Sequence, residues 1–352
     1  MGGANALLVD LAPSQKKEGH EVEILQLIES KDKTLTNKLF DLGVNVMSIS
    51  LKGSVYNPLH IFKLIPYLNK YDIVHVHLFP ALYWVGLAKL LSFSKTPLVY
   101  TEHSTSNRRR SNPILLFIDK IIYSNCYKEI IACSQKAFET YKSVFPNINV
   151  CTIPNGVDIN KNINAIPYSK KELINVDNDI FLTTMIARFA SMKRQDTVVE
   201  AISKLPSNFH VLFVGGDGGE LNRIKALVKS LKIENRIHFL GIRPDVPRIL
   251  KSSDVVIMAS DYEGLSLSSI EGMASGKPFV ASDVNGLREV VEGAGILYEN
   301  KNSDNLTKIL KKLHEDKSFY IDTIDKCLDR AKQFDISACS LAYLNVYKKY
   351  TK

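Results

Sequence analysis

Residues 255–281 read VVIMASDYEGLSLSSIEGMASGKPFVA. An apolar, β-branched run at 255–259 is followed by a polar loop and then by a segment of helical character at 270–274; a second apolar run begins at 278. Strand, loop, helix and strand in this order form a βαβ unit with parallel strands. Apolar residues at consecutive positions are typical of strands that helices cover on both faces. The stretch therefore predicts an α/β fold built on parallel sheets.

The same alternation of short apolar runs and longer amphipathic segments recurs along the whole chain. In the first half, strands are expected at residues 22–27, 44–50, 73–77, 98–102, 130–134 and 150–153. In the second half, they are expected at residues 181–186, 210–214, 236–240, 255–259, 278–281 and 295–298. Because the intervening segments have helical length, parallel sheets are expected throughout.

Two domains are expected, because 352 residues exceed what one compact core usually holds. The strand pattern restarts after Pro154-Asn155-Gly156-Val157-Asp158, where Pro and Asn-Gly signal a turn. We therefore place an N-terminal Rossmann-like domain at residues 1–156 and a C-terminal one at residues 157–335. Residues 336–352 are expected to contain a last amphipathic helix.

The amino end departs from this pattern. The chain opens at Met1-Gly2-Gly3-Ala4 and runs directly into a helix-like segment, whereas a doubly wound domain begins with a strand that leads into such a Gly-rich turn. The N-terminal sheet is therefore expected to lack its first strand. Pro13 falls within the first helix, where a proline costs about 3 kcal/mol, and a surface position is expected to accommodate it.

Composition narrows the classes of partner. The chain carries 45 Lys and Arg against 37 Asp and Glu, and the net charge of +8 favours a nucleoside diphosphate, an anionic membrane surface or a nucleic acid. The sequence has no basic stripe interleaved with aromatic residues, so binding to nucleic acid has little support. The 5 cysteines are scattered singly, as in a reduced cytoplasmic protein, without the spacing of a metal site. With no apolar stretch of about 20 residues and no signal peptide, membrane contact is expected to be peripheral.

The most informative candidate site follows the strand at 255–259. Glu263 lies on the loop at the carboxyl end of this strand, where open α/β sheets bind ligands. The backbone amides that follow open the next helix, and such a helix start suits a diphosphate. Glu271, further along, could accept hydrogen bonds from ribose hydroxyls. The donor-binding candidates in this segment are Glu263, Gly264, Leu265, Ser266, Leu267 and Glu271. The alternative is a helix cap with two solvated acids.

Two more loops follow strands of the second half. Arg188 and Lys193 come after the strand at 181–186, and a planar guanidinium with an ammonium fits a clamp on phosphate oxygens. Gly216 lies in a Gly-rich turn after the strand at 210–214, where a glycine lets a ligand approach the backbone. This turn does not match the dinucleotide fingerprint, so NAD binding has little support. The alternatives are a solvated basic loop and an ordinary Rossmann turn.

The first half contributes further candidates. Gly3, at the start of the first helix, could approach the donor phosphates, and His103 closes the strand at 98–102. A histidine at a strand end is often structural instead. The run Arg108-Arg109-Arg110 follows in a loop, where it would bind an acidic acceptor or form a solvated surface.

Together these segments resemble the large retaining family 4 of glycosyltransferases, which have the GT-B fold of two Rossmann-like domains facing a cleft. The resemblance spans nearly the whole chain, and the order and spacing of the segments carry it. Its most specific part is Glu263-x7-Glu271 with Gly-Met-Ala-Ser-Gly-Lys-Pro278, followed by Asp283-Val-Asn-Gly-Leu-Arg-Glu289. The other matching segments are Gly19-His20-Glu21-Val22, Asp72-Ile-Val-His-Val-His77, Thr101-Glu102-His103, Ile153-Pro-Asn-Gly-Val-Asp158, Arg188 to Lys193 and Gly216-Asp217-Gly218.

The resemblance implies a role for each candidate. The cations at 188 and 193 would hold the donor diphosphate, Glu263 would contact the transferred sugar and Glu271 would bind the ribose. The amides at 265–267 would hold phosphate, and Gly3 would lie near the diphosphate from the other domain. His103 would lie near the transferred sugar on the acceptor side. The C-terminal helix of residues 336–352 would pack back on the N-terminal domain. The implied catalytic residues are His103, Arg188, Lys193 and Glu263.

The implied reaction moves a sugar from a nucleoside-diphosphate sugar, with a UDP-sugar favoured, to a glycan or lipid-linked acceptor in surface polysaccharide biosynthesis. Retention at the anomeric carbon is expected, as are a cytoplasmic location at the inner face of the membrane and no metal or other cofactor. Two alternatives stay open. One is a non-catalytic or truncated nucleotide-sugar-binding protein, which the absent first strand favours. The other is a sugar-nucleotide epimerase, against which the Glu263-x7-Glu271 pattern argues.

Overall fold

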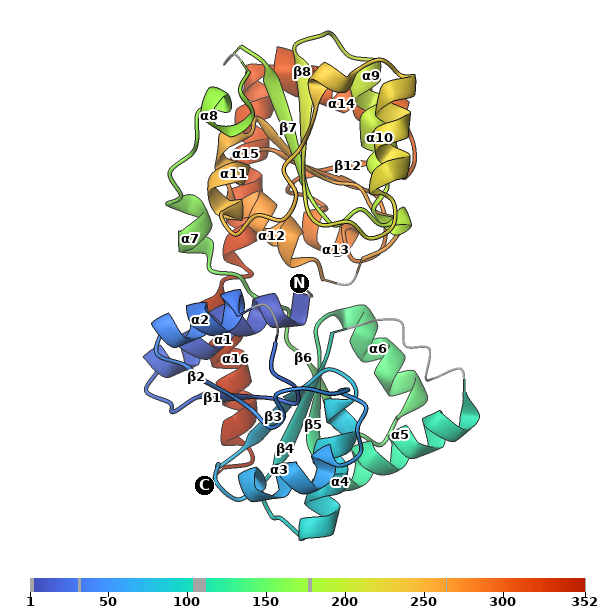
Figure 1. Ribbon diagram of the computed structural model, residues 1–352. Coiled ribbons are helices and arrows are strands. Elements are labelled where there is room, and N and C mark those ends of the chain that lie inside the picture. The colour runs from blue at the N-terminus through green and yellow to red at the C-terminus, as the bar shows by residue number, and fades with distance from the viewer. Residues whose placement is uncertain (1–2, 31–32, 104–111, 177–178, 264, 352) are drawn as a thin grey trace. The chain divides into compact units, whose positions relative to one another are not determined.

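The computed structural model describes residues 3–30, 33–103, 112–176, 179–263 and 265–351 (Figure 1). The chain forms two compact units. The first comprises Met1–Gly156 and Ile336–Lys352, and the second comprises Val157–Asp335. Every strand expected from the sequence is present, with ends shifted by a few residues, and all described strand pairs are parallel. The predicted α/β fold class is confirmed.

The second unit contains a 6-stranded parallel sheet in the order β12-β11-β10-β7-β8-β9. Its strands are β7 (Phe181–Ile186), β8 (Phe209–Val214), β9 (Ile237–Phe239), β10 (Val255–Met258), β11 (Phe279–Ser282) and β12 (Ile296–Tyr298). Its helices are α7 (Ile159–Ile163), α8 (Lys170–Ile174), α9 (Gln195–Ser203), α10 (Leu221–Ser230), α11 (Val246–Ser252), α12 (Leu267–Ala274), α13 (Arg288–Val291), α14 (Ser303–Glu315) and α15 (Lys317–Lys332), with short 3-10 turns at η2 (Ser191–Lys193) and η3 (Glu234–Arg236).

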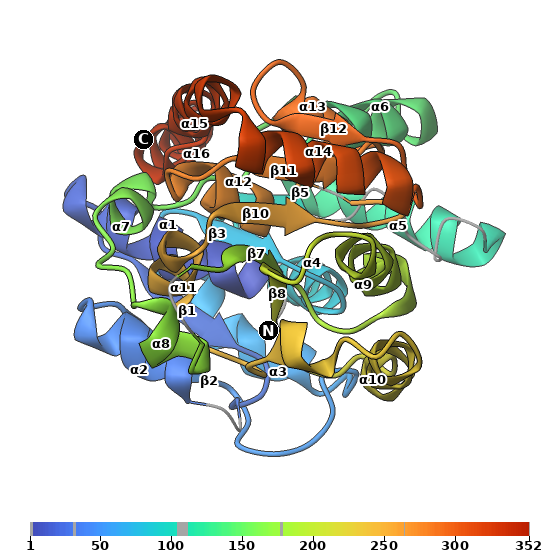
Figure 2. The ribbon, with the colours of Figure 1, turned by 90° about the horizontal axis from the view of Figure 1, so that it is seen from above.

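Helices cover both faces of this sheet. The helices α9 and α10 lie on one side of β7 and β8, and α11, α12 and α15 lie on the other (Figure 1, Figure 2). The strands β8, β10 and β11 are buried along their whole length, which is why their sequences are apolar at consecutive positions. A Cβ atom on Gly272 would lie 2.5 Å from the ring of Phe279. This glycine therefore allows α12 to pack closely on the sheet.

The first unit contains two parallel sheets, one with the order β3-β4-β5-β6 and one of β1 and β2. Its strands are β1 (Glu23–Gln26), β2 (Asn45–Ser48), β3 (Val74–His77), β4 (Leu98–Glu102), β5 (Tyr127–Ala132) and β6 (Val150–Thr152). Its helices are α1 (Gly3–Lys17), α2 (Thr34–Asp41), α3 (His60–Leu68), α4 (Ala81–Ser92), α5 (Pro113–Cys126), α6 (Gln135–Val144) and α16 (Ile336–Lys348).

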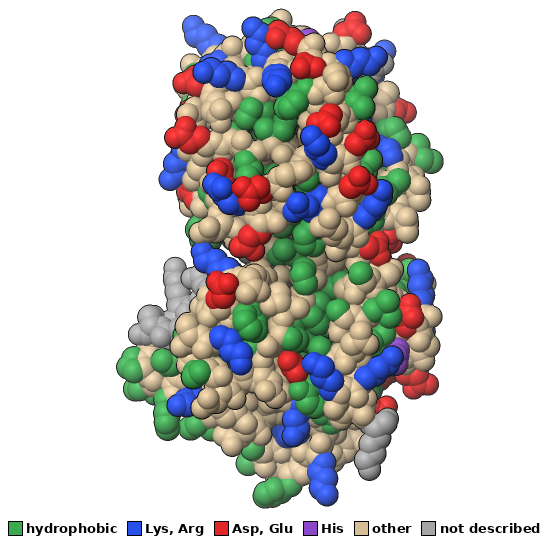
Figure 3. All heavy atoms as spheres, turned by 180° about the vertical axis from the view of Figure 1, so that it is seen from behind, with side chains coloured by type: hydrophobic (Ala, Val, Ile, Leu, Met, Phe, Trp, Pro, Cys, Tyr) green, Lys and Arg blue, Asp and Glu red, His purple; other side chains and the backbone are tan. Residues whose placement is uncertain are grey.

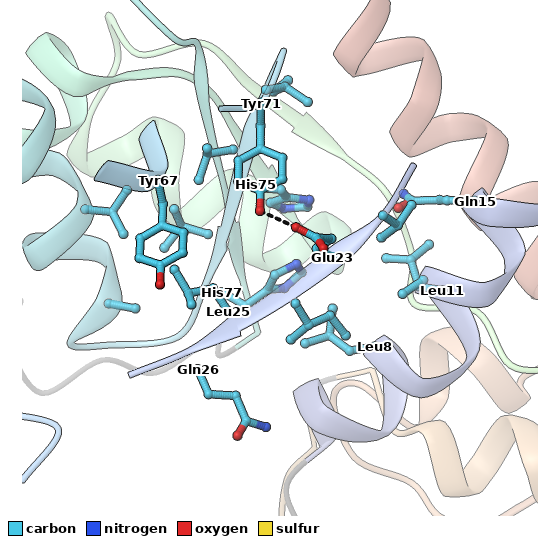
Figure 4. Close-up of a pocket in the computed structure, with 18 of the residues that line it drawn as sticks. Leu8, Leu11, Gln15, Glu23, Leu25, Gln26, Tyr67, Tyr71, His75 and His77 are labelled. Carbon is cyan, nitrogen blue, oxygen red and sulfur yellow. Dashed lines mark hydrogen bonds between the residues drawn. The ribbon is translucent and has the colours of Figure 1, made fainter. Parts of the chain in front are cut away.

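A cavity of about 1000 Å³ separates the facing edges of β1 and β3 (Figure 4). Both strands line it, together with residues of α1, α3 and α16. In the doubly wound strand order 3-2-1-4-5-6, the first strand runs between the second and the fourth. Here β1 and β3 take the second and fourth places. The cavity therefore lies where the first strand of that order would run.

Side chains from distant parts of the chain close this cavity. The hydroxyl of Tyr71 donates a hydrogen bond to Glu23 on β1 (Figure 4). Burial and this carboxylate raise the pKa of Tyr71 to about 12. On the other side, the hydroxyl of Tyr347 on α16 lies 2.5 Å from Nδ1 of His75 on β3. The C-terminal helix is thereby fixed to the sheet of the first unit.

Pro13 lies within α1 and is buried, so the expected surface position is wrong. Its neighbours Leu11 and Ala12 are also buried, at 2% and 3% exposure. Burial of apolar surface on this side of the helix offsets the backbone hydrogen bond that a proline cannot donate.

Candidate active site

Three loops leave neighbouring strands of the second sheet at their carboxyl ends. The strands β10, β7 and β8 are adjacent in the sheet, and their loops carry Glu263, Arg188 and Gly216 respectively. Parallel strands bring their carboxyl ends to one edge, which is the edge where open α/β sheets bind ligands. The sheet topology therefore gathers these three candidates, although up to 75 positions separate them in sequence.

Backbone hydrogen bonds hold the loops after β7 and β8 together. The amide of Phe189 donates to the carbonyl of Gly216 at 2.9 Å, and the amide of Gly218 donates to the carbonyl of Phe189 at 2.8 Å. Phe189 is 1% exposed, whereas the neighbouring Arg188 is exposed. The buried ring anchors the loop, so the guanidinium of Arg188 is presented to solvent from a fixed backbone.

Substitution of Gly215 tests this backbone junction. A Cβ atom there would lie 2.0 Å from the carbonyl oxygen of Ala187, which is backbone and cannot rotate away. We expect Gly215→Ala to lower the free energy of unfolding by about 3 kcal/mol in chemical denaturation. Gly219→Ala is the matched control, because its Cβ meets nothing within 4 Å and only its φ of +101° is unfavourable, costing about 1 kcal/mol. Equal losses in the two variants would contradict the proposed close approach.

Lys193 and Glu263 form an ion pair that links the loops after β7 and β10. Their side chains are 15% and 11% exposed. The backbone reinforces this link, because the amide of Asp261 donates to the carbonyl of Met192 at 2.8 Å and the hydroxyl of Ser260 donates to the same oxygen at 3.1 Å. A cation and a carboxylate are thus held together at the ligand-binding edge of the sheet.

Sequence reasoning missed the residues that support Glu263. The amide of Ser260 donates to the hydroxyl of Ser282 at 2.9 Å, and that hydroxyl donates back to the carbonyl of Ser260 at 2.7 Å. The carbonyl of Asn285 accepts from the amide of Glu263 at 3.3 Å. The one signal in the sequence was that each serine directly follows a predicted strand, Ser260 the strand at 255–259 and Ser282 the strand at 278–281.

The start of α12 lies directly beyond Glu263. The helix begins at Leu267, with Ser266 as its N-cap residue, and the side chain of Ser266 makes no capping hydrogen bond. A helix start that its own side chain does not cap offers backbone N–H groups to an anion. The side chains of Leu265 and Leu267 pack against the core of the unit, which orients this turn. Glu271 lies one turn into α12 and is half-buried.

Histidines form the corresponding group in the first unit. His103 follows β4, and its Nε2 lies 3.0 Å from Nδ1 of His77 on β3. The two rings stack with centroids 5.3 Å apart. On β3, Nε2 of His75 lies 2.7 Å from the hydroxyl of Thr101 on β4. Burial lowers the pKa of His103 to about 4 and that of His75 to about 3, so both rings are neutral at pH 7.

The remaining candidates are placed as follows. Gly3 is the first residue of α1. Arg108, Arg109, Arg110 and Gly264 lie outside the described residues. Among the residues that the structure describes, no three His, Cys, Asp or Glu side chains gather as a metal site, and no helix has the length and apolarity that crossing a bilayer requires.

Family models match both halves of the chain. The model described as Glycosyltransferase Family 4 matches residues 1–161, and the model described as Glycosyl transferases group 1 matches residues 167–333. The chain belongs to the group 1 glycosyltransferases. It is therefore a glycosyltransferase, which sets aside the epimerase alternative.

Several curated relatives of this glycosyltransferase are similar over most of their length. One is the UDP-Gal:alpha-D-GlcNAc-diphosphoundecaprenol alpha-1,3-galactosyltransferase of Escherichia coli, which is 28% identical over 77% of this chain and 73% of that protein. Another is the O-antigen biosynthesis glycosyltransferase WclY of Escherichia coli, 23% identical over 98% of this chain and 94% of that protein. The N-acetyl-alpha-D-glucosaminyl L-malate synthase of Bacillus anthracis is 26% identical over 83% of this chain and 78% of that protein.

Solved structures share the fold of this glycosyltransferase. The crystal structure of Anabaena Alr3699/HepE in complex with UDP matches with a TM-score of 0.83 and 22% identity, over 99% of this chain and 96% of that one. The apo form of the lipopolysaccharide outer core galactosyltransferase WaaB matches with a TM-score of 0.70 and 17% identity, over 99% and 96%. The predicted GT-B fold is thereby confirmed.

Proposed function

We propose that this glycosyltransferase transfers a sugar from a nucleoside-diphosphate sugar, with a UDP-sugar favoured, to a glycan or lipid-linked acceptor of surface polysaccharide biosynthesis. The observation that carries the proposal is the cluster of Arg188, Lys193 and Glu263 at the carboxyl edge of the second sheet, beside the start of α12. Relatives named for UDP-Gal, diphosphoundecaprenol and O-antigen substrates support it, as does a structural neighbour in complex with UDP.

The cluster suits the leaving group of such a reaction. The bond between the anomeric carbon and a phosphate oxygen breaks, and its electron pair stays on the phosphate. Arg188, Lys193 and the N–H groups at Leu267 would face that growing negative charge and stabilise the transition state more than the ground state. The acceptor hydroxyl would bond to the anomeric carbon on the same face, and its proton would pass to the leaving phosphate. The configuration would be retained, without a metal ion or another cofactor.

Glu263 of this cluster and Glu271 on α12 would bind the rest of the donor. Glu263 would accept hydrogen bonds from the hydroxyls of the transferred sugar, and Glu271 would accept from the ribose. In the structure, Glu263 is paired with Lys193. Binding of the donor would give both side chains new partners. The sugar hydroxyls would donate to the carboxylate of Glu263, and the diphosphate would accept from the ammonium of Lys193.

His103 would act on the acceptor side as a neutral hydrogen-bonding group. Its lowered pKa of about 4 keeps the ring uncharged at neutral pH, and its contact with Nδ1 of His77 fixes the ring orientation. A neutral imidazole can hold a sugar hydroxyl without drawing the negative charge of the phosphate toward the acceptor. Gly3, at the start of α1, would lie near the diphosphate, and Arg108-Arg109-Arg110 would meet an acidic acceptor.

Thermal unfolding of the purified chain against UDP, GDP, ADP, their sugar conjugates and NAD tests the donor. A ligand that binds only the folded protein stabilises it by about 2.7 kcal/mol at 100 times its dissociation constant. We expect UDP and a UDP-sugar to raise Tm, and NAD to leave it unchanged. A rise in Tm with GDP or ADP alone would assign guanine or adenine, rather than uracil, as the base of the donor. An unchanged Tm with every nucleotide would contradict the proposed site.

A further inference from the structure

The two histidines of β3 lie side by side. Residues two apart in a strand share a face, so the side chains of His75 and His77 point the same way. Their ring centroids are 4.2 Å apart, and both side chains line the cavity between β1 and β3 (Figure 4). Both are half-buried, and histidine forms only small patches on the side of the molecule drawn in Figure 3. The ring of His77 is therefore supported by that of His75.

Hydrogen bonds occupy both nitrogens of His75. The hydroxyl of Tyr347 on α16 lies 2.5 Å from Nδ1, and the hydroxyl of Thr101 on β4 lies 2.7 Å from Nε2. The hydroxyl of Thr101 donates to that of Tyr343 at 3.4 Å. Because Thr101 uses its proton there, it accepts from the Nε2–H of His75, and the bare Nδ1 of the neutral ring accepts from Tyr347. The C-terminal helix thus fixes both the orientation and the tautomer of His75.

The contact between His77 and His103 decides the hydrogen-bonding character of the other nitrogen of His103. Nδ1 of His77 lies 3.0 Å from Nε2 of His103. Burial lowers the pKa of both rings, so both are neutral at neutral pH and one donates to the other. Nδ1 of His103 is buried and has no hydrogen-bond partner among the described residues. Because a neutral imidazole carries one proton, the contact with His77 determines whether this Nδ1 donates or accepts.

We propose that His77 and Tyr347 are positioning residues for His103 in sugar transfer. Tyr347 holds the ring of His75, the ring of His75 packs against His77, and His77 sets the orientation and the tautomer of the ring at 103. A ring that is already oriented loses no freedom when its Nδ1 meets a hydroxyl of the transferred sugar. This inference rests on the proposed function, because it names the residues that orient a group of the acceptor side.

Substitutions of His77 test the last contact. His77→Phe keeps a ring against His75 and removes the hydrogen bond, so we expect kcat to fall by about tenfold and KM to change less than about twofold. His77→Asn should return kcat to within about threefold, because its amide takes the place of Nδ1 and can donate or accept. An equal loss of kcat in both variants would overturn the proposal.

The second unit offers a matched control for these variants. Nδ1 of His210 lies 3.0 Å from Nε2 of His238, and their ring centroids are 5.3 Å apart, as in the pair of His77 and His103. His210 is the second residue of β8, toward the amino end of the strand and away from the candidate site. His210→Phe should therefore keep the rate per folded molecule. A tenfold loss there would show that such contacts act through the fold, and would overturn the proposal.

A double-mutant cycle shows whether these residues act through His103. In a His103→Ala background, His77→Phe should lower kcat less than about twofold, because the ring that it orients is absent. Tyr347→Phe should lower kcat by about threefold in the unmodified chain and leave it unchanged in that background. Tyr350→Phe is its control, because this hydroxyl ties the same end of the chain to Glu129 on β5 at 2.6 Å, and should keep the rate. Equal losses with and without His103 would refute the proposed path.

Proton–nitrogen correlation spectra of isotope-labelled histidine rings test the contact without any substrate. We expect the signals of His103, assigned by their loss in His103→Gln, to report one tautomer in the unmodified chain and a mixture in His77→Phe. One and the same tautomer in both would overturn the proposal. Loss of the nucleotide response of Tm, with the change of tautomer intact, would instead reject only the donor site. Comparable Tm values of His77→Phe and His77→Asn in buffer exclude unfolding as the cause of their different rates.

Discussion

Arg188→Ala is expected to lower kcat/KM for sugar transfer by about two to three orders of magnitude, with an unchanged Tm. The side chain is exposed and rests on a loop that the buried Phe189 anchors, so its removal leaves the fold intact. The lost guanidinium would otherwise face the phosphate oxygens on which negative charge grows as the glycosidic bond breaks. The loss should therefore fall on kcat more than on KM.

Two variants control this result. Arg188→Lys should recover part of the rate, because the charge returns without the planar pair of donors. Lys326→Ala removes a cation of 54% side-chain exposure, which pairs with Asp322 on α15, and should leave the rate unchanged. A steady-state assay that found a tenth or more of the activity in Arg188→Ala would count strongly against the assigned role.

Lys193→Met is expected to lower both stability and activity, and a second substitution should separate the two effects. The single variant leaves the largely buried carboxylate of Glu263 without its cation, which should cost about 2–3 kcal/mol of unfolding free energy. Adding Glu263→Gln removes that uncompensated charge, so the double variant should regain most of the stability. Transfer should stay about a hundredfold or more below that of the unmodified chain, because both groups would contact the donor.

The ion pair of Lys170 and Asp254 provides a matched control for this experiment. Its atoms lie 2.7 Å apart, and its side chains are 14% and 26% exposed. Asp254 precedes β10, at the edge of the sheet opposite Glu263. We expect Lys170→Met to cost comparable stability in denaturation while the rate per folded molecule is retained. If Lys193→Met lost stability but kept its rate, the pair would be structural only.

The strands were predictable because the sheets are covered on both faces. Parallel strands between helical layers bury consecutive apolar residues, and this leaves a local signal in the sequence. The prediction failed where a polar residue is buried. β5 begins at Tyr127, before the expected residue 130. It includes Glu129, which is 6% exposed and accepts a hydrogen bond from Tyr350 at 2.6 Å. That partner is 221 positions away, so no local pattern reveals it.

The candidate site could likewise be predicted only in part. Arg188, Lys193 and Glu263 could be singled out because each follows a predicted strand, and the carboxyl ends of parallel strands share one edge. The supporting pair of Ser260 and Ser282 could not, since isolated serines at strand ends carry no distinctive pattern. Their hydrogen bonds depend on the pairing of β10 with β11, which the sequence alone does not order.

The sequence by itself therefore determined the fold class, the strands and the loops that carry the candidate residues, because periodicity and turn residues act within short segments. Tertiary structure alone decided which side chains meet. It paired Lys193 with Glu263 and His77 with His103, and it placed the cavity between β1 and β3. The physical reason is that strand order and helix packing, rather than separation along the chain, set the distance between side chains on different strands.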